Sequence, residues 1–295
     1  MPAVSLLVAC HDAGGAEIVS SWLRRRPDAH SVPCLLGGPA QAIFARSLGP
    51  ALRTVDALPP LDGLDLVVCG SSAEALLERR AVRAARAAGV RSAVWLDHWV
   101  NYPERFVLDG ELVLPDEVWV ADEHAQRLAG QTLPGARIRL CGNPYLEDAA
   151  AEIHALEPKR RGAGERILYV TQPTTVAAQM ATGDPLGWGY EERGALRGYL
   201  ERLAEAPPAA VRIRLHPAES EDKYAGVLEA FDDRLALEFS RSESLAEDCA
   251  WADTVAGCDT MAMVVALAAG RRVVSVIPPG GEPLSLPFAE IERLF

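Results

Sequence analysis

Residues 211–217 read VRIRLHP, and residues 252–278 read ADTVAGCDTMAMVVALAAGRRVVSVIP. The first stretch is an apolar strand that ends in a histidine and a proline. The second reads as a strand, a tight turn, a helix of small residues and another strand. In a βαβ unit the carboxyl end of a strand and the amino end of the next helix lie at the same edge of the sheet. We therefore expect His216 and the turn at Asp259 and Thr260 to line one crevice, which suits the phosphates of a nucleotide.

The length and composition are those of a soluble globular protein. The chain has 295 residues, of which 49% are hydrophobic and 24% charged, enough for one large or two ordinary domains. Its net charge of -12 argues against non-specific binding to nucleic acid, which needs a basic surface. The apolar runs are too short for a transmembrane span, and the first residues lack the basic segment of a signal peptide. We expect a cytoplasmic protein.

The six cysteines are scattered along the chain, and none forms a CxxC pair. Most of them lie within apolar, strand-like runs or at the ends of such runs. This favours reduced thiols in the core of a cytosolic protein over a disulfide framework or a metal site. We expect neither a metal nor a cofactor. The cysteines are Cys10, Cys34, Cys69, Cys141, Cys249 and Cys258.

Apolar runs of strand length alternate with helical patterns from end to end. They are continuous apolar blocks, which is typical of parallel strands covered on both faces. The pattern predicts an α/β fold of two Rossmann-like domains facing a cleft. Strands are expected at residues 5–10, 32–36, 64–69, 92–96, 117–121 and 137–141, and then at 166–171, 211–215, 235–239, 254–256 and 272–277. Helices are expected at residues 16–26, 39–48, 73–88 and 123–128, and then at 192–205, 220–231, 244–251 and 261–269.

The boundary between the two halves follows the sequence Gly-Asn-Pro at residues 142–144, which is typical of a turn. Residues 145–156 have the pattern of an amphipathic helix, and residues 157–165 read EPKRRGAGE, a charged linker. We therefore expect one domain at residues 1–156 and a second at residues 157–295. Residues 173–190 are rich in glycine, proline and threonine and are expected to form a long functional loop.

Candidate chemistry in the first half begins where the first strand ends. Gly14 and Gly15 precede a helix, so they let a ligand approach the backbone and the free N–H groups of the helix. The loop is not GxGxxG, and no acidic residue ends the second strand, so the dinucleotide fingerprint is absent. His11 and Asp12 stand where a general base belongs. The alternative is that Asp12 caps the helix and His11 merely lies at the edge.

Two further loops of the first half follow strands. Ser71 and Ser72 are expected either to cap the next helix or to contact a ligand. Residues 97–106 read DHWVNYPERF and combine acid, histidine, aromatic, amide and arginine side chains, as in a sugar or acceptor pocket. Asp97 and His98 are therefore candidate catalytic residues. The alternative is a surface loop with satisfied hydrogen bonds and Trp99 turned inward.

In the second half, polar residues again follow the strands. Thr171 and Gln172 offer a hydroxyl and an amide to phosphate or ribose. Pro217 biases His216 towards an extended conformation, which aims the imidazole out of the end of the sheet. The donor-binding candidates are Gly14 and Gly15 in the first half and, in the second half, Thr171, Gln172, His216, Pro217, Ser242, Ser244, Gly257, Asp259 and Thr260.

Capping is the alternative for several of these candidates. Ser242 and Ser244 precede a helix and look like a capping segment, although their place after a strand also suits ribose or base contacts. Gly257 and Thr260 belong to the turn before the last full helix, whose first N–H groups are free. Asp259 repels a phosphate, so we expect it to cap the helix or to bind a ribose hydroxyl.

These residues resemble those of glycosyltransferases of the GT-B fold. The resemblance rests on the order of elements, the loop at residues 11–17, His216 with Pro217, and the strand, turn and helix at residues 256–268. A histidine-proline pair followed by a Ser/Thr motif is similar to bacterial sialyltransferases and polysialyltransferases, and to the glycerol-phosphate transferases of wall teichoic acid synthesis. The resemblance implies a first domain for a glycan or small-molecule acceptor and a second domain for a CMP-sugar or other nucleotide-sugar donor. It also implies that His216 contacts the donor phosphate, supported by Ser242, Ser244 or Thr260.

The chain departs from these families in its length, which leaves little room for a carboxyl-terminal helix after residue 287. It also lacks the paired glutamates typical of retaining hexosyltransferases, which favours an inverting mechanism. Asp12 or His11 would then be the base, with Asp97 and His98 as the second choice. The alternatives are a nucleotide-sugar 2-epimerase or hydrolase of the same fold, and a non-catalytic protein that binds a nucleotide-sugar.

Overall fold

The computed structural model describes residues 4–157 and 164–295. The chain divides into two compact units, residues 1–146 and residues 147–295. Helix α5 (Pro144–Leu156) contains this division near its start and ends at the boundary expected after residue 156. Its later part belongs to the second unit, because His154 Nε2 lies 3.1 Å from the carbonyl oxygen of Ala269. The linker residues 158–163 lie outside the described residues.

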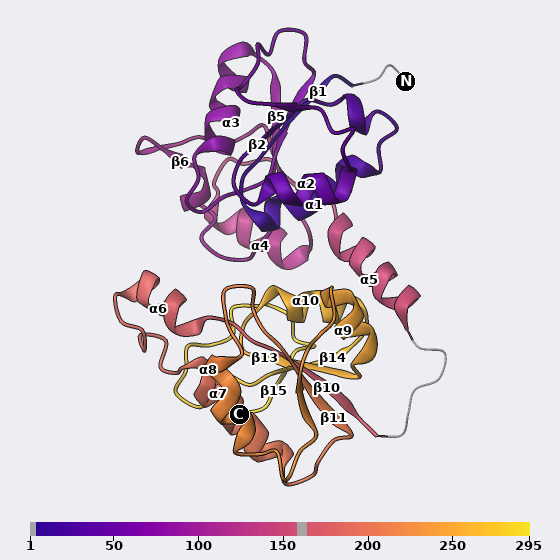
Figure 1. Cartoon of the computed structure of the whole chain (residues 1–295). Helices are drawn as coiled ribbons and strands as arrows, with labels where there is room; N and C mark the ends of the chain where they lie inside the picture. Colours follow the sequence, from indigo (N-terminus) through magenta and orange to yellow (C-terminus); the bar gives the residue numbers. More distant parts are fainter. Residues whose placement is uncertain (1–3, 158–163) are drawn as a thin grey trace. The chain divides into compact units, whose positions relative to one another are not determined.

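The first unit contains a parallel sheet of seven strands in the order β3-β2-β1-β4-β5-β8-β9 (Figure 1). The strands are β1 (Leu6–Cys10), β2 (Cys34–Leu36), β3 (Thr54–Val55), β4 (Leu66–Cys69), β5 (Arg91–Trp95), β8 (Glu117–Val120) and β9 (Ile138–Leu140). The helices are α1 (Ala13–Arg24), α2 (Ala40–Leu48), α3 (Leu77–Ala88) and α4 (Glu123–Thr132), with 3-10 turns at Ala29–Ser31 and Glu104–Phe106. A short hairpin of β6 (Val107–Leu108) and β7 (Glu111–Leu112) follows the second turn.

Both faces of this sheet are buried, as the continuous apolar runs predict. Leu6, Val8 and Cys10 of β1 belong to the core cluster that includes residues of α1 and α2. Because side chains alternate along a strand, Leu7 and Ala9 face the opposite side, and both are fully buried. Three tryptophans, Trp22 on α1, Trp95 on β5 and Trp119 on β8, meet edge to face with ring centroids 5.1–6.4 Å apart.

The second unit contains a parallel sheet of six strands in the order β12-β11-β10-β13-β14-β15. The strands are β10 (Arg166–Val170), β11 (Ala210–Arg214), β12 (Leu237–Phe239), β13 (Thr254–Gly257), β14 (Arg272–Ser275) and β15 (Glu292–Arg293). The helices are α6 (Thr174–Thr182), α7 (Glu192–Leu203), α8 (Asp222–Glu229), α9 (Leu245–Trp251) and α10 (Met261–Ala268). Tyr169, Leu196, Val211 and Tyr224 belong to one core cluster, which joins α7 and α8 to the sheet.

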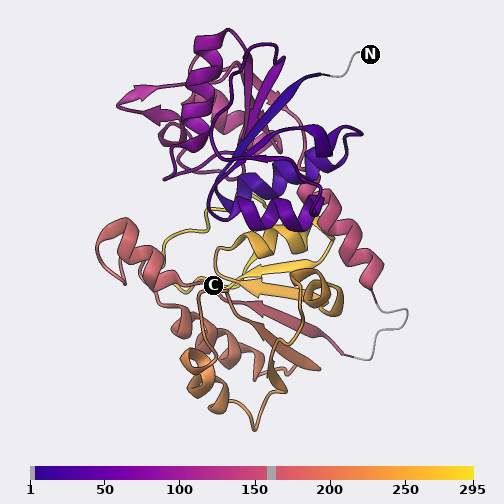
Figure 2. The same cartoon turned by 45° about the horizontal axis from the view of Figure 1, so that its top comes forward.

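Two expectations from the sequence are corrected. Residues 173–190 are not one long loop, because they include helix α6, which stands away from the sheet of its unit (Figure 1 and Figure 2). Pro173 before the helix and Gly183, left-handed after it, are the signals that delimit α6. The helix expected from residue 73 begins at Leu77, so Ser71 and Ser72 do not cap it.

The environments of the cysteines and the lengths of the helices relate to two expectations from the sequence, namely reduced core thiols and the lack of a transmembrane span. Five cysteines are buried and Cys141 is half-buried, and none forms a disulfide within the described residues. Burial raises the pKa of Cys34, Cys249 and Cys258 to about 12. Over residues 4–157 and 164–295, three or more histidine, cysteine, aspartate or glutamate side chains nowhere gather as metal ligands would. Over the same residues, no helix has the length and apolar character that crossing a membrane requires.

Candidate functional site

A histidine and an aspartate at the end of β1 form an oriented pair. His11 Nδ1 lies 2.7 Å from Asp12 Oδ1, and Ser72 Oγ donates to Asp12 Oδ2 at 2.7 Å. An ionised carboxylate only accepts hydrogen bonds, so Nδ1 carries the proton and Nε2 of the neutral ring is an acceptor. Asp12 stands at the N-cap of α1, yet its side chain makes no capping bond. The geometry therefore favours a pair that can remove a proton over simple capping.

The glycines that end β2 explain how His11 is held. A Cβ atom on Gly37 would lie 2.8 Å from His11 Cδ2, and one on Gly38 would lie 2.8 Å from His11 Nε2. Such distances are too short for real side-chain atoms, so the imidazole packs directly on this stretch of backbone. The two glycines are therefore a flat support for the ring.

Glu78 on α3 is a neighbour of His11 that sequence reasoning missed. Its Oε1 accepts the backbone N–H of His11 at 2.6 Å. The residue is only 3% exposed, and burial raises the pKa of its carboxyl group. Its second oxygen, Oε2, has no hydrogen-bond partner among the described residues. A single glutamate within an arginine-rich helix gave no sequence signal, because only the fold brings it beneath His11.

Asp97, the second-choice base, is held in a buried ion pair. Its Oδ1 accepts from Arg105 Nη1 at 2.8 Å and from Ser71 Oγ at 2.7 Å. The side chains of Asp97 and Arg105 are 13% and 9% exposed. If Asp97 accepted a proton as a base, its carboxylate would become neutral and the buried ion pair would be lost, which is costly. The geometry therefore favours His11 and Asp12 over Asp97.

The rest of the loop at residues 97–106 is anchored internally. Trp99 is buried and donates its indole N–H to Asp122 Oδ2 at 2.9 Å, at the start of α4. His98 Nδ1 accepts the backbone N–H of Trp99 at 3.0 Å. These contacts match the alternative of a loop with Trp99 turned inward.

Gly14 and Gly15 pack against the protein itself. A Cβ on Gly14 would strike the carboxylate of Asp97, and one on Gly15 would lie 2.8 Å from the backbone nitrogen of Ser71. The loops after β1, β4 and β5 therefore touch at these glycines. The place that a side chain would take at each glycine is filled by a neighbouring loop, and the role expected of the two glycines in ligand binding stays a prediction.

In the second unit, the residues after the central strand β10 join the loops on either side. Thr171 Oγ1 accepts the backbone N–H of His216 at 2.8 Å, and Gln172 Oε1 accepts the backbone N–H of Asp259 at 3.0 Å. His216 and the turn at Asp259 thus lie at the same sheet edge, as expected. The Thr171 hydroxyl also donates to Glu219 Oε2 at 2.5 Å, so it is engaged within the protein.

His216 is exposed and holds a defined tautomer. Its Nδ1 accepts the backbone N–H of Ala218 at 3.1 Å, so in the neutral ring the proton sits on Nε2. The following Pro217 is also exposed, and a turn closes where the N–H of Glu219 donates to the carbonyl of His216. The ring therefore offers an N–H donor at the sheet edge, as a phosphate contact requires.

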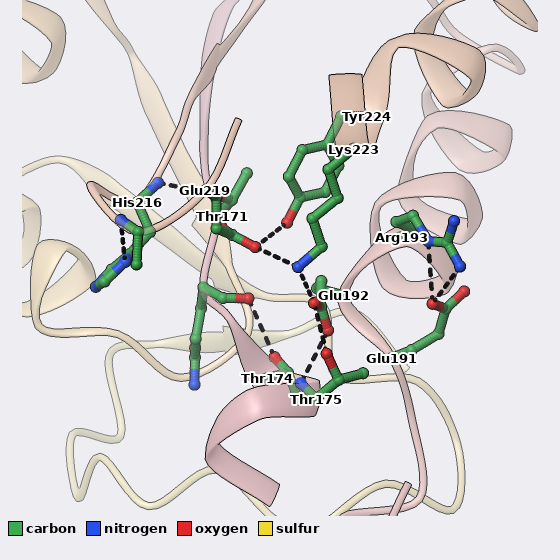
Figure 3. Close-up of polar contacts among 12 residues, drawn as sticks. Thr171, Thr174, Thr175, Glu191, Glu192, Arg193, His216, Glu219, Lys223 and Tyr224 are labelled. Carbon is green, nitrogen blue, oxygen red and sulfur yellow. Dashed lines mark hydrogen bonds and ion pairs between the residues drawn. The ribbon is translucent and has the colours of Figure 1, made fainter. Parts of the chain in front are cut away.

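Behind His216 lies a network of two buried glutamates and a partly exposed lysine that the sequence did not reveal (Figure 3). Glu219 accepts from Tyr224 Oη at 2.8 Å and from Lys223 Nζ at 2.7 Å. Lys223 also contacts Glu192, which in turn accepts the N–H and hydroxyl of Thr175. The pKa of Lys223 is raised, because its hydrogen bonds to the two glutamates outweigh the cost of burial. The network ties the His216 loop to α6, α7 and α8.

The remaining candidates make local contacts. Ser244 caps α9 by accepting from the N–H of Glu247 at 3.1 Å, while Ser242 O accepts from Arg214. Thr260 is the N-cap of α10, so Asp259 is not, and its carboxylate accepts the N–H of Ser285 at 2.9 Å. Gly257 packs on Val170, since a Cβ there would lie 2.9 Å from Val170 Cγ2. Capping, packing or hydrogen bonds within the protein engage all five of these residues.

The likeness to known proteins lies in the fold. No protein-family model matches the chain, and no curated protein matches it in sequence. UDP-GlcNAc 2-epimerase from Neisseria meningitidis, solved with UDP-GlcNAc, superposes with a TM-score of 0.61 at 10% identity, over 92% of this chain and 81% of that one. A putative UDP-N-acetylglucosamine 2-epimerase from Listeria monocytogenes gives 0.58 at 12% identity, over 92% and 79%. MurG from Acinetobacter baumannii gives 0.52 at 12% identity, over 94% and 80%.

The chain has a GT-B-type fold. It consists of two Rossmann-like domains, as the sequence predicted. Both epimerases and a protein named MurG share this fold, so the fold by itself does not choose between reaction types.

Proposed function

We propose that this protein is a metal-independent, inverting glycosyltransferase that uses a nucleotide-activated sugar, CMP-linked or other. The observation that supports it best is the oriented pair of His11 and Asp12, because a protein that only binds a nucleotide-sugar needs no base. In this proposal the first domain takes the acceptor and the second domain takes the donor.

The proposed reaction is a single displacement at the anomeric carbon of the donor sugar. The acceptor oxygen forms a bond to this carbon, and the bond from the carbon to the donor phosphate oxygen breaks. The electron pair of that bond leaves with the phosphate, and His11 Nε2 takes the proton of the acceptor hydroxyl. Asp12 stabilises the resulting imidazolium, and such a base typically contributes about 10²–10⁴-fold in rate.

On the donor side, the exposed Nε2–H of His216 supports a contact with the leaving phosphate. It stands at the carboxyl edge of a parallel sheet, where ligands of α/β proteins bind. Donation to the departing oxygen stabilises the charge that develops there. The amide nitrogen of Gln172 makes no hydrogen bond with the described residues, so it is a second donor available at this edge.

Ligand-induced stabilisation tests the donor site. CMP, CDP, UDP, GDP and dTDP are each added to the protein, and the melting temperature is measured. A nucleotide at ~100 times its dissociation constant stabilises the folded state by ~2.7 kcal/mol. We expect His216→Ala to weaken this shift, whereas His30→Ala, an exposed histidine of the first unit, leaves it unchanged. If no nucleotide stabilises the protein, the proposed function is wrong.

The second candidate is a nucleotide-sugar 2-epimerase or hydrolase, favoured by the structural likeness to the two epimerases. NMR of the nucleotide-sugar in D2O separates the reactions. An epimerase exchanges the proton at the sugar C2 for deuterium, a hydrolase releases free sugar, and a transferase consumes donor only when acceptor is present. His11→Ala, Asp12→Asn and Asp97→Asn are assayed separately. Turnover that survives the first two changes would show that the base is misassigned.

A further inference from the structure

A groove of about 420 Å³ in the first unit is lined by the proposed base. His11 forms part of its wall, together with the apolar side chains of Leu35, Leu58, Leu76 and Leu77. Two charged residues, Asp56 and Arg80, also line it. This volume and this mostly apolar lining are those of a small-molecule site.

Arg80 differs from the other arginines of α3. Arg79 donates to the carbonyls of Ser72, Ala73, Arg105 and Val107, so it is fully used in holding loops. Arg83 pairs with Asp109, and Arg86 donates to the carbonyl of Leu114. In the part of the chain that the structure describes, the Arg80 guanidinium has no ion pair, although Asp56 lines the same groove. An exposed cation beside apolar walls is suited to pair with an anionic group of a ligand.

We propose that this groove binds the acceptor, and that the acceptor is a hydroxylated molecule with an apolar body and one anionic group. The apolar body lies against the leucines, the anionic group pairs with Arg80, and the hydroxyl reaches His11 Nε2. Asp56 disfavours a second negative charge. The proposal rests on the proposed function, since it gives the acceptor hydroxyl to the same base.

The probe is 4-hydroxybenzoate, which has a ring, a hydroxyl and a carboxylate. Its affinity is measured by titration calorimetry and compared with those of 4-hydroxybenzyl alcohol, which lacks the charge, and glucose 6-phosphate, which lacks the apolar body. We expect Arg80→Gln to lower the affinity for 4-hydroxybenzoate about fivefold, as the loss of an exposed ion pair would, and to leave the affinity for 4-hydroxybenzyl alcohol unchanged. Arg83→Gln, on the same helix but outside the groove, is the matched control and should have no effect.

A second variant blocks the groove. Ala57 is exposed and lines it, so Ala57→Trp fills the space without disturbing the core. We expect this variant to lose 4-hydroxybenzoate binding while its stability is unchanged. Four outcomes would each overturn the proposal. They are a lack of 4-hydroxybenzoate binding by the unmodified protein, a preference of that protein for glucose 6-phosphate, binding of 4-hydroxybenzoate that persists in Ala57→Trp, and binding by Arg80→Gln that is as tight as that of the unmodified protein.

The nucleotide stabilisation assay, run on the same variants, separates the two proposals. Arg80→Gln and Ala57→Trp should keep the full nucleotide-induced shift, because neither residue belongs to the second unit. If 4-hydroxybenzoate binds in the groove but no nucleotide stabilises the protein, the proposed function is wrong and the groove is still a ligand-binding site. If a nucleotide stabilises the protein but 4-hydroxybenzoate does not bind, the proposed function stands and the proposed class of acceptor is wrong.

Discussion

Asp97 Oδ2 lies 1.9 Å from the point that a Cβ atom on Gly14 would occupy. The carboxylate of one loop therefore fills the place of a side chain on another. The other oxygen of Asp97, Oδ1, accepts from Arg105 and Ser71, so a shift of this carboxylate would disturb both hydrogen bonds. The identity of residue 14 is thus fixed by an ion pair formed far away in the sequence.

We predict that Gly14→Ala destabilises the protein by about 2–4 kcal/mol, because the new methyl group displaces a buried, paired carboxylate. The free energy of unfolding is measured by denaturant titration. Gly226→Ala is the matched control, since Gly226 is an exposed helical glycine with open space around it. That change should stabilise the protein by about 0.4–1 kcal/mol. A neutral effect of Gly14→Ala would contradict the packing described here.

Thr171 links His216 to the buried network, and this predicts a loss of nucleotide affinity when its hydroxyl is removed. Thr171→Val leaves the N–H of His216 and the carboxylate of Glu219 without their partner. We expect roughly tenfold weaker nucleotide binding, together with a loss of about 1–3 kcal/mol in stability. Titration calorimetry gives the first quantity and denaturant titration the second.

Thr171→Ser keeps the hydroxyl but lacks the methyl group, so it separates the positioning of His216 by the hydroxyl from the packing of the methyl group. It should restore the affinity close to that of the unmodified protein, even if a missing methyl group costs some stability. If Thr171→Val binds nucleotide as tightly as Thr171→Ser, the network does not position His216.

Glu78 predicts a pH dependence of stability. Burial raises the pKa of its carboxyl group above the value in the unfolded chain, so the folded state binds this proton more tightly. The resulting stabilisation is complete below the unfolded-state pKa and is lost as the pH rises through the folded-state pKa. Glu78→Gln stays neutral at every pH, and its amide oxygen still accepts from His11. Its stability relative to the unmodified protein should therefore increase from mildly acid to neutral pH.

Glu117→Gln is the control for this experiment, because the pKa of Glu117 is shifted in the opposite direction to that of Glu78. The hydrogen bond from Trp119, followed by the contacts with Arg139 and Arg91, lowers the pKa of Glu117 despite its burial. Its stabilisation is present above the unfolded-state pKa and is lost as the pH falls through the folded-state pKa. Parallel denaturant titrations across the acid range should thus show opposite trends for the two variants. The same trend in both would mean that the burial of Glu78 does not govern its proton.

The sequence predicted the layers of the fold and the sheet edges, because continuous apolar strands and the residues that follow them are local signals. His11, Asp12 and His216 were found in this way, since each follows a strand directly. The partners that define their chemistry were not found. Glu78 and Lys223 reach the sheet edges only through the packing of α3 and α8, and Glu219 does so through the turn after His216. Gly37 and Gly38 matter because the ring of His11, which follows another strand, packs on them. The contacts of Gly14 and Gly15 with neighbouring loops were not visible from the sequence either, and their expected role in ligand binding stays a prediction.

The thiols predict selective labelling. Cys141 is half-buried, whereas the other five cysteines are buried. Because the thiolate is the reacting form, burial and a raised pKa make a cysteine slow to react. Burial raises the pKa of Cys141 as well, so we expect its thiol to react more slowly than a free thiol but ahead of the other five, and Cys141→Ser to abolish this first phase of the reaction with Ellman's reagent. All six should react in denaturant, and a first phase that remains in Cys141→Ser would show that another thiol is accessible.

The three edge-to-face indoles of the first unit, Trp22, Trp95 and Trp119, have a spectroscopic consequence. Chromophores held this close at fixed angles couple their electronic transitions, which gives paired circular dichroism bands of opposite sign. The coupling depends on all three rings keeping their mutual orientation, and all three belong to the first unit. The protein thus carries an intrinsic optical signal for the tertiary order of one domain, so the melting of that domain can be followed without a label.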